Sequence, residues 1–391
     1  MDKEYANEKI NAAQIVALLG LPVQLSEKLS SFVTKPADEE PGERFHPIIP
    51  VDRGQGDANV IQCPDGILTL FDFGSNNDDA DRFWVGPEMQ DFFADKAGLI
   101  RNIIVSHQHW DHYRLLPDTF PASSTLTGLE NIYISCTAAD MAQTMVDWVN
   151  AINGTHLLRE FNAGGKCGPI GPSCGTIDVC PNDPEITLQV MAANLGQHCT
   201  DGGNKNIDSI VVKLTWGSIS VLLPGDFEDE TSDWGEEGPQ KLMVDYYGSQ
   251  LDVTITELCH HGSSYSSNKP VWRDAVRPEV LFASGDPWFQ YQHPRCDVFD
   301  SYITYVGTVC KPLAAPTDPL YCGENLLPDP QPGETLQDTY TCGFNNETFT
   351  TRTGNEYAFY TTVPDETRIN LIDISTDGTN FGVRYVDQSG L

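Results

Sequence analysis

Basic residues are scarce in this chain of 391 residues: 23 Lys and Arg stand against 56 Asp and Glu, which gives a formal net charge of −33. Proteins that bind long nucleic acids or anionic membranes depend on Lys and Arg contacts to phosphate, and an acidic surface repels both. The composition therefore disfavours a nucleic-acid clamp. A small or singly phosphorylated substrate remains compatible with it.

Long hydrophobic runs are also missing. The longest apolar stretch, residues 15–23, is interrupted by Gly20 and Pro22 and is far shorter than the roughly 18–20 residues of a membrane span. The residues before it mix acidic with basic side chains, which is a poor signal-peptide pattern, so we expect a secreted form to carry its leader outside this sequence. The apolar fraction of 40 % fits a globular protein with one large domain or two smaller ones.

Cysteine is plentiful but forms no Cys-x-x-Cys pair, which argues against a zinc ribbon or a thioredoxin-type site. Of the 11 cysteines, eight fall in two loop-rich stretches, 167–199 and 296–342. Such clusters are typical of disulfides in an oxidising compartment. We therefore expect several cysteines of these stretches to form disulfides, with their pairing left open. We also expect a secreted, extracellular protein, with a cytoplasmic location as the alternative. Cys63, Cys136 and Cys259 lie in apolar surroundings and are expected to be buried thiols.

Short apolar strands alternate with helices along most of the chain, which predicts an α/β layered fold. Residues 1–45 are expected to form a helical extension with a polar linker. Residues 46–391 are expected to form one domain with loop inserts near 160–205 and 308–350. We find no internal repeat and no low-complexity tract.

The strongest chemical signal is a group of three histidines and one aspartate within six residues. It follows a buried strand predicted at 99–105 and consists of His107, His109, Asp111 and His112. Side chains two positions apart at a strand end point the same way, and imidazole and carboxylate are ligands of divalent metal ions. Since the chain has only nine histidines, this group predicts a site for two neighbouring metal ions.

Two further strand ends carry side chains of the same types. A strand predicted at 219–224 is followed by Asp226, and one at 253–257 leads to His260 and His261. A carboxylate at such a position can bridge two metal ions about 3.5–4 Å apart. Either pattern alone would be an ordinary turn, but together they extend the predicted metal site.

In this order, HxHxDH, GD and HHGS resemble the ligand motifs of the metallo-β-lactamase fold. Further motifs narrow the resemblance to the branch of the hydrolase domain of the bacterial competence (DNA-uptake) channel protein. These are GQGDA at 54–58, FDFG at 71–74, NIDS at 206–209, and Gly285 with YQHP at 291–294. The resemblance covers about residues 46–300 and a strand-rich tail. It implies a four-layer αββα sandwich with a metal site at one edge, between the two sheets.

The resemblance also implies a role for each candidate ligand. One metal ion would be held by His107 and His109, the other by Asp111, His112 and His261, and Asp226 would bridge the two. Asp72 would support the histidines from behind, because ligand histidines usually need an outer carboxylate. Many members of the fold place a third histidine on the first ion. Here Asn206 stands at the matching position, and His198 is the alternative.

The implied chemistry is metal-assisted hydrolysis by two divalent ions, zinc or else manganese. A carboxylate bridge fits the hard oxygen environment of a phosphodiesterase, so the expected substrate is a small or head-group phosphodiester, or a nucleic acid, which the acidic charge disfavours. Asp111 would also steer the nucleophile. His260 and His293 would protonate the leaving oxygen or bind a phosphate, and a structural role at the turn of Pro294 is equally open for His293.

Two other functions stay open. The same site would serve the hydrolysis of an ester, a lactone or a lactam. Alternatively, an extracellular structural or binding protein could have kept the fold, and the Cys-rich inserts and acidic surface would suit it. The intact metal motifs argue against that last alternative.

Overall fold

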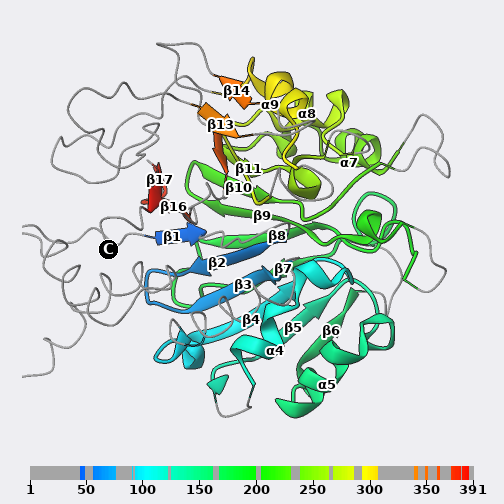
Figure 1. Ribbon diagram of the computed structural model, residues 1–391, viewed down its shortest axis with the longest axis vertical. Helices are drawn as coiled ribbons and strands as arrows, with labels where there is room; N and C mark the ends of the chain where they lie inside the picture. Colours follow the sequence, from blue (N-terminus) through cyan, green and yellow to red (C-terminus); the bar gives the residue numbers. More distant parts are fainter. Residues whose placement is uncertain are drawn as a thin grey trace, which may run out of the picture.

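Two β-sheets lie face to face with helices on both outer sides (Figure 1). The computed structural model describes residues 45–48, 56–75, 90, 93–121, 125–161, 167–199, 204–229, 238–263, 267–285, 293–306, 339–341, 348–350, 359–361, 371–379 and 381–386. The helical extension expected over residues 1–45 lies outside these residues, except for Phe45, which begins the first strand. The insert expected near 308–350 is described only at 339–341 and 348–350.

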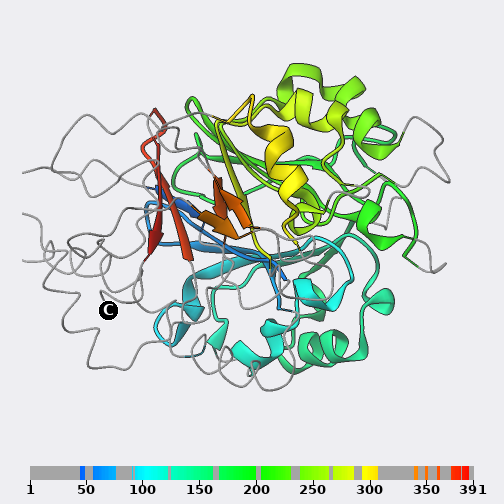
Figure 2. The same cartoon turned by 45° about the horizontal axis from the view of Figure 1, so that its top comes forward.

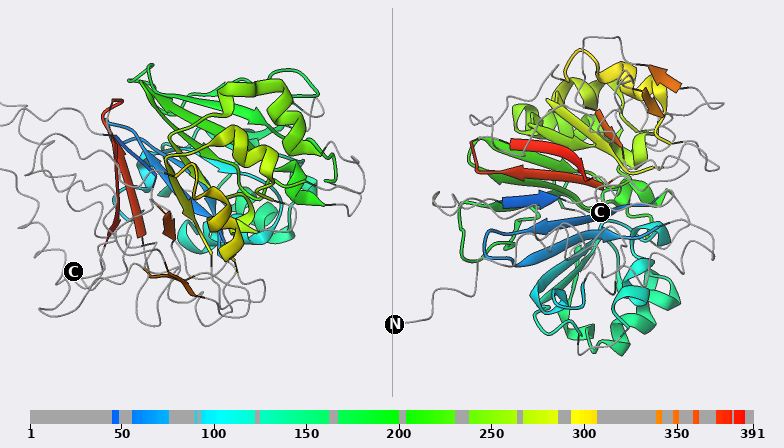
Figure 3. Two further views of the ribbon diagram at one scale, coloured as in Figure 1. Left: turned by 90° about the horizontal axis from the view of Figure 1, so that it is seen from above. Right: turned by 60° about the vertical axis from the view of Figure 1, so that its left-hand side comes forward.

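The first sheet has eight strands in the order β17-β16-β1-β2-β3-β4-β5-β6. Their bounds are β1 Phe45–Ile48, β2 Ala58–Gln62, β3 Leu68–Phe73, β4 Ile100–Val105, β5 Asn131–Ile134, β6 Leu158–Glu160, β16 Leu371–Thr376 and β17 Phe381–Val386. The C-terminal strands β16 and β17 extend the sheet beside β1, as the red and blue ribbons of Figure 3 show. Strands β3 to β6 are parallel, so their carboxyl ends meet at one edge.

The second sheet has seven strands in the order β15-β12-β11-β10-β9-β8-β7. Their bounds are β7 Thr176–Ile177, β8 Thr187–Ala192, β9 Val211–Trp216, β10 Ile219–Leu223, β11 Ile255–Glu257, β12 Val280–Ala283 and β15 Phe359–Thr361. Strands β10, β11 and β12 are parallel neighbours, and their carboxyl ends also share one edge. A separate hairpin is formed by β13 (Thr339–Thr341) and β14 (Thr348–Thr350).

Helices cover the outer face of each sheet (Figures 1 and 2). Beside the first sheet lie α4 Leu115–Thr119 and α5 Gln143–Ala151, and beside the second lie α7 Pro239–Tyr247 and α8 Pro270–Val276. α9 Cys296–Tyr302 packs instead with the cluster shared by the two sheets. Short 3₁₀ helices are η1 Ala97–Leu99, η2 Trp110–His112, η4 Ala138–Asp140, η5 Thr155–Leu157, η7 Lys205–Asp208, η8 Gly248–Leu251 and η9 Cys259–Gly262. None of the described helices is long and apolar enough to cross a membrane.

The core consists of three apolar layers, one at each boundary between sheets or between a sheet and its helices. Successive residues of one strand face different layers: Phe71 of β3 and Leu223 of β10 pack in the cluster shared by both sheets. Their neighbours Leu70 and Leu222 pack against the helices on the two outer sides. A strand buried on both faces is apolar along its whole length. This burial explains the continuous apolar runs and agrees with the expected four-layer αββα sandwich.

Disulfides tie the first loop-rich stretch to the rest of the fold. Three join described cysteines: Cys63–Cys180, Cys136–Cys199 and Cys167–Cys174. All four cysteines of 167–199 are thus disulfide-bonded, as expected, and Cys296 is disulfide-bonded as well. Only one of the three bridges lies within this stretch. Several disulfides are typical of an oxidising environment.

The prediction of buried thiols is confirmed for Cys259 and wrong for Cys63 and Cys136. Both are buried, as expected, but they follow β2 and β5 at the points where the 167–199 stretch packs onto the strands. Apolar surroundings predict burial, and a buried cysteine is compatible with a thiol or a disulfide alike. Whether such a cysteine forms a disulfide depends on whether the fold brings a second cysteine, distant in the chain, beside it.

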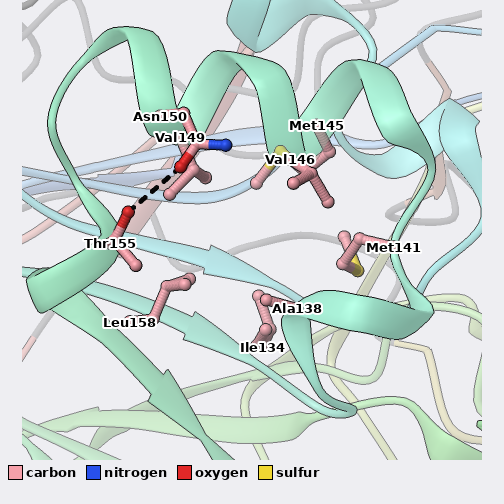
Figure 4. A pocket seen from close by; sticks show the side chains of 9 residues that line it. All are labelled: Ile134, Ala138, Met141, Met145, Val146, Val149, Asn150, Thr155 and Leu158. Carbon is pink, nitrogen blue, oxygen red and sulfur yellow. Dashed lines mark hydrogen bonds between the residues drawn. The ribbon is translucent and has the colours of Figure 1, made fainter.

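A small apolar cavity lies between α5 and the first sheet (Figure 4). Met145 and Val149 of α5 line one side, and Ile134 of β5 and Leu158 of β6 line the other. The side chains around it carry no charge. It has no group for acid–base or metal chemistry, and the candidate site lies elsewhere.

Candidate metal centre

The candidate site lies where the carboxyl ends of parallel strands from both sheets meet. In the first sheet, β3 ends beside Asp72 and β4 leads to His107. In the second sheet, β10 leads to Asp226 and β11 to His261. Because carboxyl ends of parallel strands share an edge, four segments far apart in sequence come together here, and His107 Nε2 lies 3.7 Å from Asp226 Oδ2.

Asp226 is the centre of the site, with two imidazoles on each of its carboxylate oxygens. Its Oδ1 lies 3.3 Å from Nε2 of His112 and 3.3 Å from Nε2 of His261. Its Oδ2 lies 3.7 Å from Nε2 of His107 and 3.6 Å from Nε2 of His260. The side chain is almost fully buried. The arrangement is that expected of a carboxylate shared by two cations.

Three buried polar atoms at this centre have no hydrogen-bond partner among the described residues: His112 Nε2, His261 Nε2 and Asp226 Oδ1. One ring nitrogen of each histidine and one carboxylate oxygen each of Asp226 and Asp57 lie within 4.8 Å of one another. Buried polar groups in proteins are nearly always paired, and a divalent cation between these atoms would satisfy all three. Asp111 Oδ2, 4.0 Å from His261 Nε2, adds a further carboxylate. The residues present therefore fit a metal ion.

A second group of ligand atoms lies on the other side of Asp226. His107 Nε2 and His109 Nδ1 are 2.9 Å apart, and both lie within 4.8 Å of an Asp226 oxygen. The other ring nitrogen of His107 is 3.1 Å from Ser106 Oγ. The structure thus brings four of the predicted ligands, His107, His109, His112 and His261, around a fifth, Asp226. The sixth, Asp111, lies beside His261 and outside both groups.

Asp72 orients the motif loop from behind. Its Oδ2 lies 2.9 Å from His112 Nδ1, and its Oδ1 accepts a 2.6 Å hydrogen bond from the Ser106 backbone N–H. A carboxylate on Nδ1 leaves the Nε2 lone pair of the imidazole for a metal ion. Gly74 brings the backbone close: a Cβ there would lie 1.9 Å from the carbonyl oxygen of Asp111. Only glycine allows this approach.

Asp57, for which the sequence suggested no individual role, also contacts the cluster. Its Oδ1 lies 3.2 Å from His261 Nδ1 and accepts a hydrogen bond from Ser284 Oγ, so it orients His261 as Asp72 orients His112. It precedes β2, which is antiparallel to β3, and the start of β2 therefore lies at the edge where β3 ends. The GQGDA motif was the available signal, but an aspartate at the start of a strand resembles an ordinary turn residue.

Burial and mutual charge set the protonation of the cluster. Burial raises the pKa of Asp226, but the surrounding histidines, His260 first, outweigh it and hold the pKa well below its usual range. Burial lowers the pKa of His261, but Asp57 and Asp226 outweigh it and raise the pKa to about 10. For His107, burial and the neighbouring His112 both lower the pKa. Positive charge is therefore stabilised on the His261 side of Asp226, where a cation would displace a proton.

The remaining predicted residues lie around the cluster. His260 Nδ1 is 3.0 Å from Glu228 Oε2, and Asn206 Nδ2 donates a 3.2 Å hydrogen bond to the other oxygen of that carboxylate. His198 belongs to neither group of ligand atoms. The ring of His293 lies 5.5 Å from that of His260, and burial together with the charges of the two adjacent histidines lowers its pKa to about 2.

A third group of potential ligand atoms, Cys136, Cys199 and Asp208, lies outside this centre. The two cysteines form a disulfide, so they offer no thiolate to a metal ion.

Comparisons with known proteins support a distant relationship over part of the chain. No protein-family model matches it. "Competence protein ComA" of Neisseria gonorrhoeae is 36% identical over 94 residues, which are 23% of this chain and 12% of that protein. "Uncharacterized protein YcaI" of Escherichia coli (strain K12) is 31% identical over 106 residues, which are 27% of this chain and 13% of that protein. The chain thus spans a small part of the length of these relatives.

Among solved structures, three are similar to this chain with low overall scores. The CmlA beta-hydroxylase E377D mutant has a TM-score of 0.35 and 15% identity, and the match covers 72% of this chain and 56% of that chain. The metallo-beta-lactamase fold protein YhfI from Bacillus subtilis has a TM-score of 0.32 and 13% identity, with coverages of 55% and 70%. Human tRNase Z, short form, has a TM-score of 0.33 and 13% identity, with coverages of 60% and 91%. The sheet order, the layers and the position of the Asp/His cluster define an α/β metallo-β-lactamase-like fold. The expected fold and the partial homology to a competence protein are confirmed.

Proposed function

From this metallo-β-lactamase-like fold with its buried Asp/His cluster, we propose that the protein is a hydrolase dependent on two divalent metal ions, zinc or alternatively manganese. The observation that supports it best is Asp226, whose two oxygens each face two imidazoles. Mixed imidazole and carboxylate ligands suit zinc, and the share of carboxylates admits manganese.

Each ion has its own set of ligands in this proposal. The first is held by His107 and His109, the second by Asp111, His112 and His261, and Asp226 is shared. Asp72 and Asp57 keep the imidazoles of the second set in the orientation that exposes Nε2. The chemistry that two divalent ions supply at such a site is activation of water near neutral pH and neutralisation of charge on a substrate oxygen.

The open side of the cluster indicates where a substrate would enter. The side chains of His112 and His261 are fully buried, whereas those of Asp111 and His260 are 12% and 21% exposed. Asp111 on this side would orient the attacking water. His260 would contact the substrate oxygens as proton donor or phosphate ligand. His293, whose ring lies 5.5 Å from that of His260 and whose lowered pKa keeps it neutral, would contact them as a hydrogen-bond donor.

We propose a phosphodiester as the substrate class, small or part of a head group. The shared carboxylate gives a hard oxygen environment, which suits phosphate oxygens. The net charge of −33 opposes a long nucleic acid. The disulfides favour a protein that acts outside the cytoplasm. Ester, lactone or lactam hydrolysis at the same site is the second candidate, because the metal ligands alone do not distinguish a carbonyl from a phosphoryl centre.

A substrate panel with added zinc or manganese tests the proposal. The panel contains bis-p-nitrophenyl phosphate, single-stranded DNA, a lactone and nitrocefin, and each is run with the wild type and with Asp226→Ala. We expect metal-dependent turnover of the phosphodiester that the variant lacks. Turnover of the lactone or nitrocefin alone would move the protein to the second class, and no turnover of any substrate would favour a structural or binding protein.

A further inference from the structure

One of the three disulfides that join described cysteines lies at the edge that carries the metal centre. Cys136 follows β5 by two residues after Ile134, which pairs with Val105 of β4. His107 also stands two residues after its strand, so Cys136 and His107 leave neighbouring strands at the same level. Cys199 follows β8, which runs parallel to β10 because both are antiparallel to β9. The Cys136–Cys199 bridge therefore joins the two sheets where their metal ligands meet.

In the first sheet, the bridge contacts the metal loop through Gln108. This side chain is buried, and its Nε2 donates a 3.1 Å hydrogen bond to Cys136 Sγ. Gln108 stands between His107 and His109, which form one group of ligand atoms with Asp226. A displacement of Cys136 therefore acts on the residue whose backbone connects these two imidazoles.

In the second sheet, the bridge contacts η7. Cys199 Sγ lies 3.8 Å from Oδ2 of Asp208, the last residue of this short helix. Asn206 of the same helix donates to Glu228, and Glu228 contacts His260. On each sheet, the bridge thus touches a segment that holds candidate functional side chains.

We propose that oxidation of Cys136 and Cys199 controls the proposed metal centre, so that the chain binds its metal ions tightly only after this bridge has formed. The inference rests on the proposed function and adds its regulation. A metal ion beside Asp226 needs ligands from both sheets, and its affinity depends on how firmly their edges are held together. Without the bridge, Gln108 and Asp208 no longer pack against a fixed pair of sulfur atoms. The hydrolase is therefore inactive in a reducing compartment and active in an oxidising one.

Formation of the bridge is a two-electron oxidation. The thiols of Cys136 and Cys199 together lose two protons and two electrons as their S–S bond forms. An external disulfide such as oxidised glutathione accepts them, and its own S–S bond breaks to give two thiols. Both cysteines are buried in the folded chain, so a reductant reaches them only when the fold opens. The control therefore acts once, as the chain folds in an oxidising compartment.

The Cys63–Cys180 bridge is a matched control at the opposite edge. It also joins the two sheets and is buried, but Cys63 follows the far end of β2 and Cys180 precedes β8. It closes a separation of 117 residues against 63 for Cys136–Cys199, so its loss should destabilise the fold at least as much. If the Cys136–Cys199 bridge only stabilised the fold, the two losses would affect metal binding in the same order.

Metal titration of four full-length proteins tests the proposal. They are the wild type, Cys136→Ser/Cys199→Ser, Cys63→Ser/Cys180→Ser and Gln108→Met, which keeps the bridge and removes the amide that contacts it. Each is freed of metal, and zinc affinity and stoichiometry are measured by calorimetry with a competing chelator. Circular dichroism and urea denaturation report folding and stability.

We expect two zinc ions with the same affinity in the wild type and in Cys63→Ser/Cys180→Ser. Cys136→Ser/Cys199→Ser should bind zinc more weakly than both, although its stability falls no further than that of the control. Loss of an outer partner of metal ligands typically lowers affinity about 10- to 100-fold, and we expect this range for the bridge variant. Gln108→Met should lose affinity as well, because the bridge no longer contacts the metal loop.

The proposal is wrong if Cys136→Ser/Cys199→Ser binds two zinc ions as tightly as the wild type, or if both double variants lose affinity in proportion to their loss of stability. The proposed metal centre would survive either result, whereas a wild type that binds less than one ion would contradict the centre itself. If Cys136→Ser/Cys199→Ser does not fold, Gln108→Met decides the question: wild-type affinity in that variant overturns the proposal.

Discussion

At the scale of single residues, Asp226 and the side chains that face it make up most of the candidate metal centre. Its position after β10 places one carboxylate between imidazoles that come from two different sheets. The histidines are in turn oriented by Asp72, Asp57 and Glu228. The centre therefore consists of an inner set that faces Asp226 and an outer set of carboxylates that fixes ring orientation.

Replacing Asp226 should be the most damaging single change to metal binding. Asp226→Ala removes the oxygen atoms shared by both ions and leaves two cations with less negative charge between them. We expect the metal content of the variant to fall below one ion per chain, whereas His109→Ala should lose mainly the first ion and His261→Ala mainly the second. Elemental analysis after dialysis against zinc measures this, and equal losses in all three variants would argue against a bridging role.

Asp57 should affect metal binding only through His261. Asp57→Asn keeps the size of the side chain but replaces the carboxylate that lies 3.2 Å from His261 Nδ1. We expect a loss of about 10- to 100-fold in affinity for the second ion and no change for the first. Calorimetric titration measures it, with Asp245→Asn on the surface of α7 as the control. An unchanged second affinity would show that Asp57 has only a structural role.

Asp208 should give the protein a measurable dependence of stability on pH. Burial raises its pKa to about 6, although the backbone N–H groups of His198 and Gln197 donate to it at 2.7 Å. Since the folded value exceeds the unfolded value of 3.8, this group stabilises the fold most at low pH, and the stabilisation is lost as the pH rises through about 6.

Between pH 7.5 and 5, the free energy of unfolding of the wild type should therefore rise by about 1.4 kcal/mol relative to Asp208→Asn. Urea denaturation in the presence of a chelator, at both pH values, measures the difference. The same change of stability with pH in both proteins would show that Asp208 is not the titrating group.

Most side chains of the inner set stand out in the sequence, whereas part of the outer set does not. His107, His109, Asp111 and His112 stand together in the chain, so their density alone marks them. Asp57 and Glu228 are single acidic residues in a chain with 56 of them. Their role depends on the start of β2 and the end of β10 lying at the same edge of the fold, which is a property of the folded sheets and not of any local pattern.

At the scale of secondary structure elements, the close contact between the end of β3 and η2 holds the motif loop in place. Gly74 lies directly against the backbone of Asp111, so an added Cβ would meet the carbonyl oxygen at 1.9 Å. The two elements are also joined by the contact of Asp72 Oδ2 with His112 Nδ1 at 2.9 Å. The position of two candidate ligands, Asp111 and His112, therefore depends on a residue that carries no side chain.

Gly74→Ala should both destabilise the fold and weaken the second metal site. Forcing a methyl group into a packed contact typically costs about 1–3 kcal/mol, and here the opposing atom is backbone, which cannot turn aside. Gly98→Ala is the control, because the nearest atom to its Cβ is the side-chain Oγ1 of Thr127 at 3.0 Å. Urea denaturation and zinc titration measure both effects. Equal small losses in the two variants would contradict the packing account.

Elements buried on both faces were predictable, whereas those in the loop-rich stretch were not. The runs predicted at 99–105 and 219–224 correspond to β4 and β10, whose apolar residues face two core layers. In contrast, β7 and β8 lie within 160–205, where the sequence predicted loops. β7 has only two residues, which is too short for a periodic pattern. The disulfides of Cys167 and Cys180 also hold this region, and such pairings cannot be inferred from the local sequence.

At the scale of the whole molecule, disulfides connect segments that lie far apart in the sequence. Cys63–Cys180 closes a separation of 117 residues, whereas Cys167–Cys174 closes one of 7. A cross-link that closes a longer loop restricts the unfolded chain more. The first bridge should therefore stabilise the molecule more than the second.

Replacing both cysteines of each bridge by serine tests this expectation. On the loop-entropy model, loss of Cys63–Cys180 should lower the free energy of unfolding by about 2–3 kcal/mol more than loss of Cys167–Cys174. Urea denaturation of the two double variants measures the difference, and a larger effect for the short loop would contradict it. Neither pairing was predictable, because the distant partner of a cysteine follows from the fold.

The number of metal ions bound by the purified wild-type chain tests the central claim most directly. The chain is freed of metal with a chelator, incubated with zinc or with manganese, dialysed and subjected to elemental analysis. The arrangement of imidazoles on both oxygens of Asp226 predicts two ions per chain. Less than one ion per chain with either metal would contradict a dinuclear hydrolase and favour a structural or binding protein that has kept the fold.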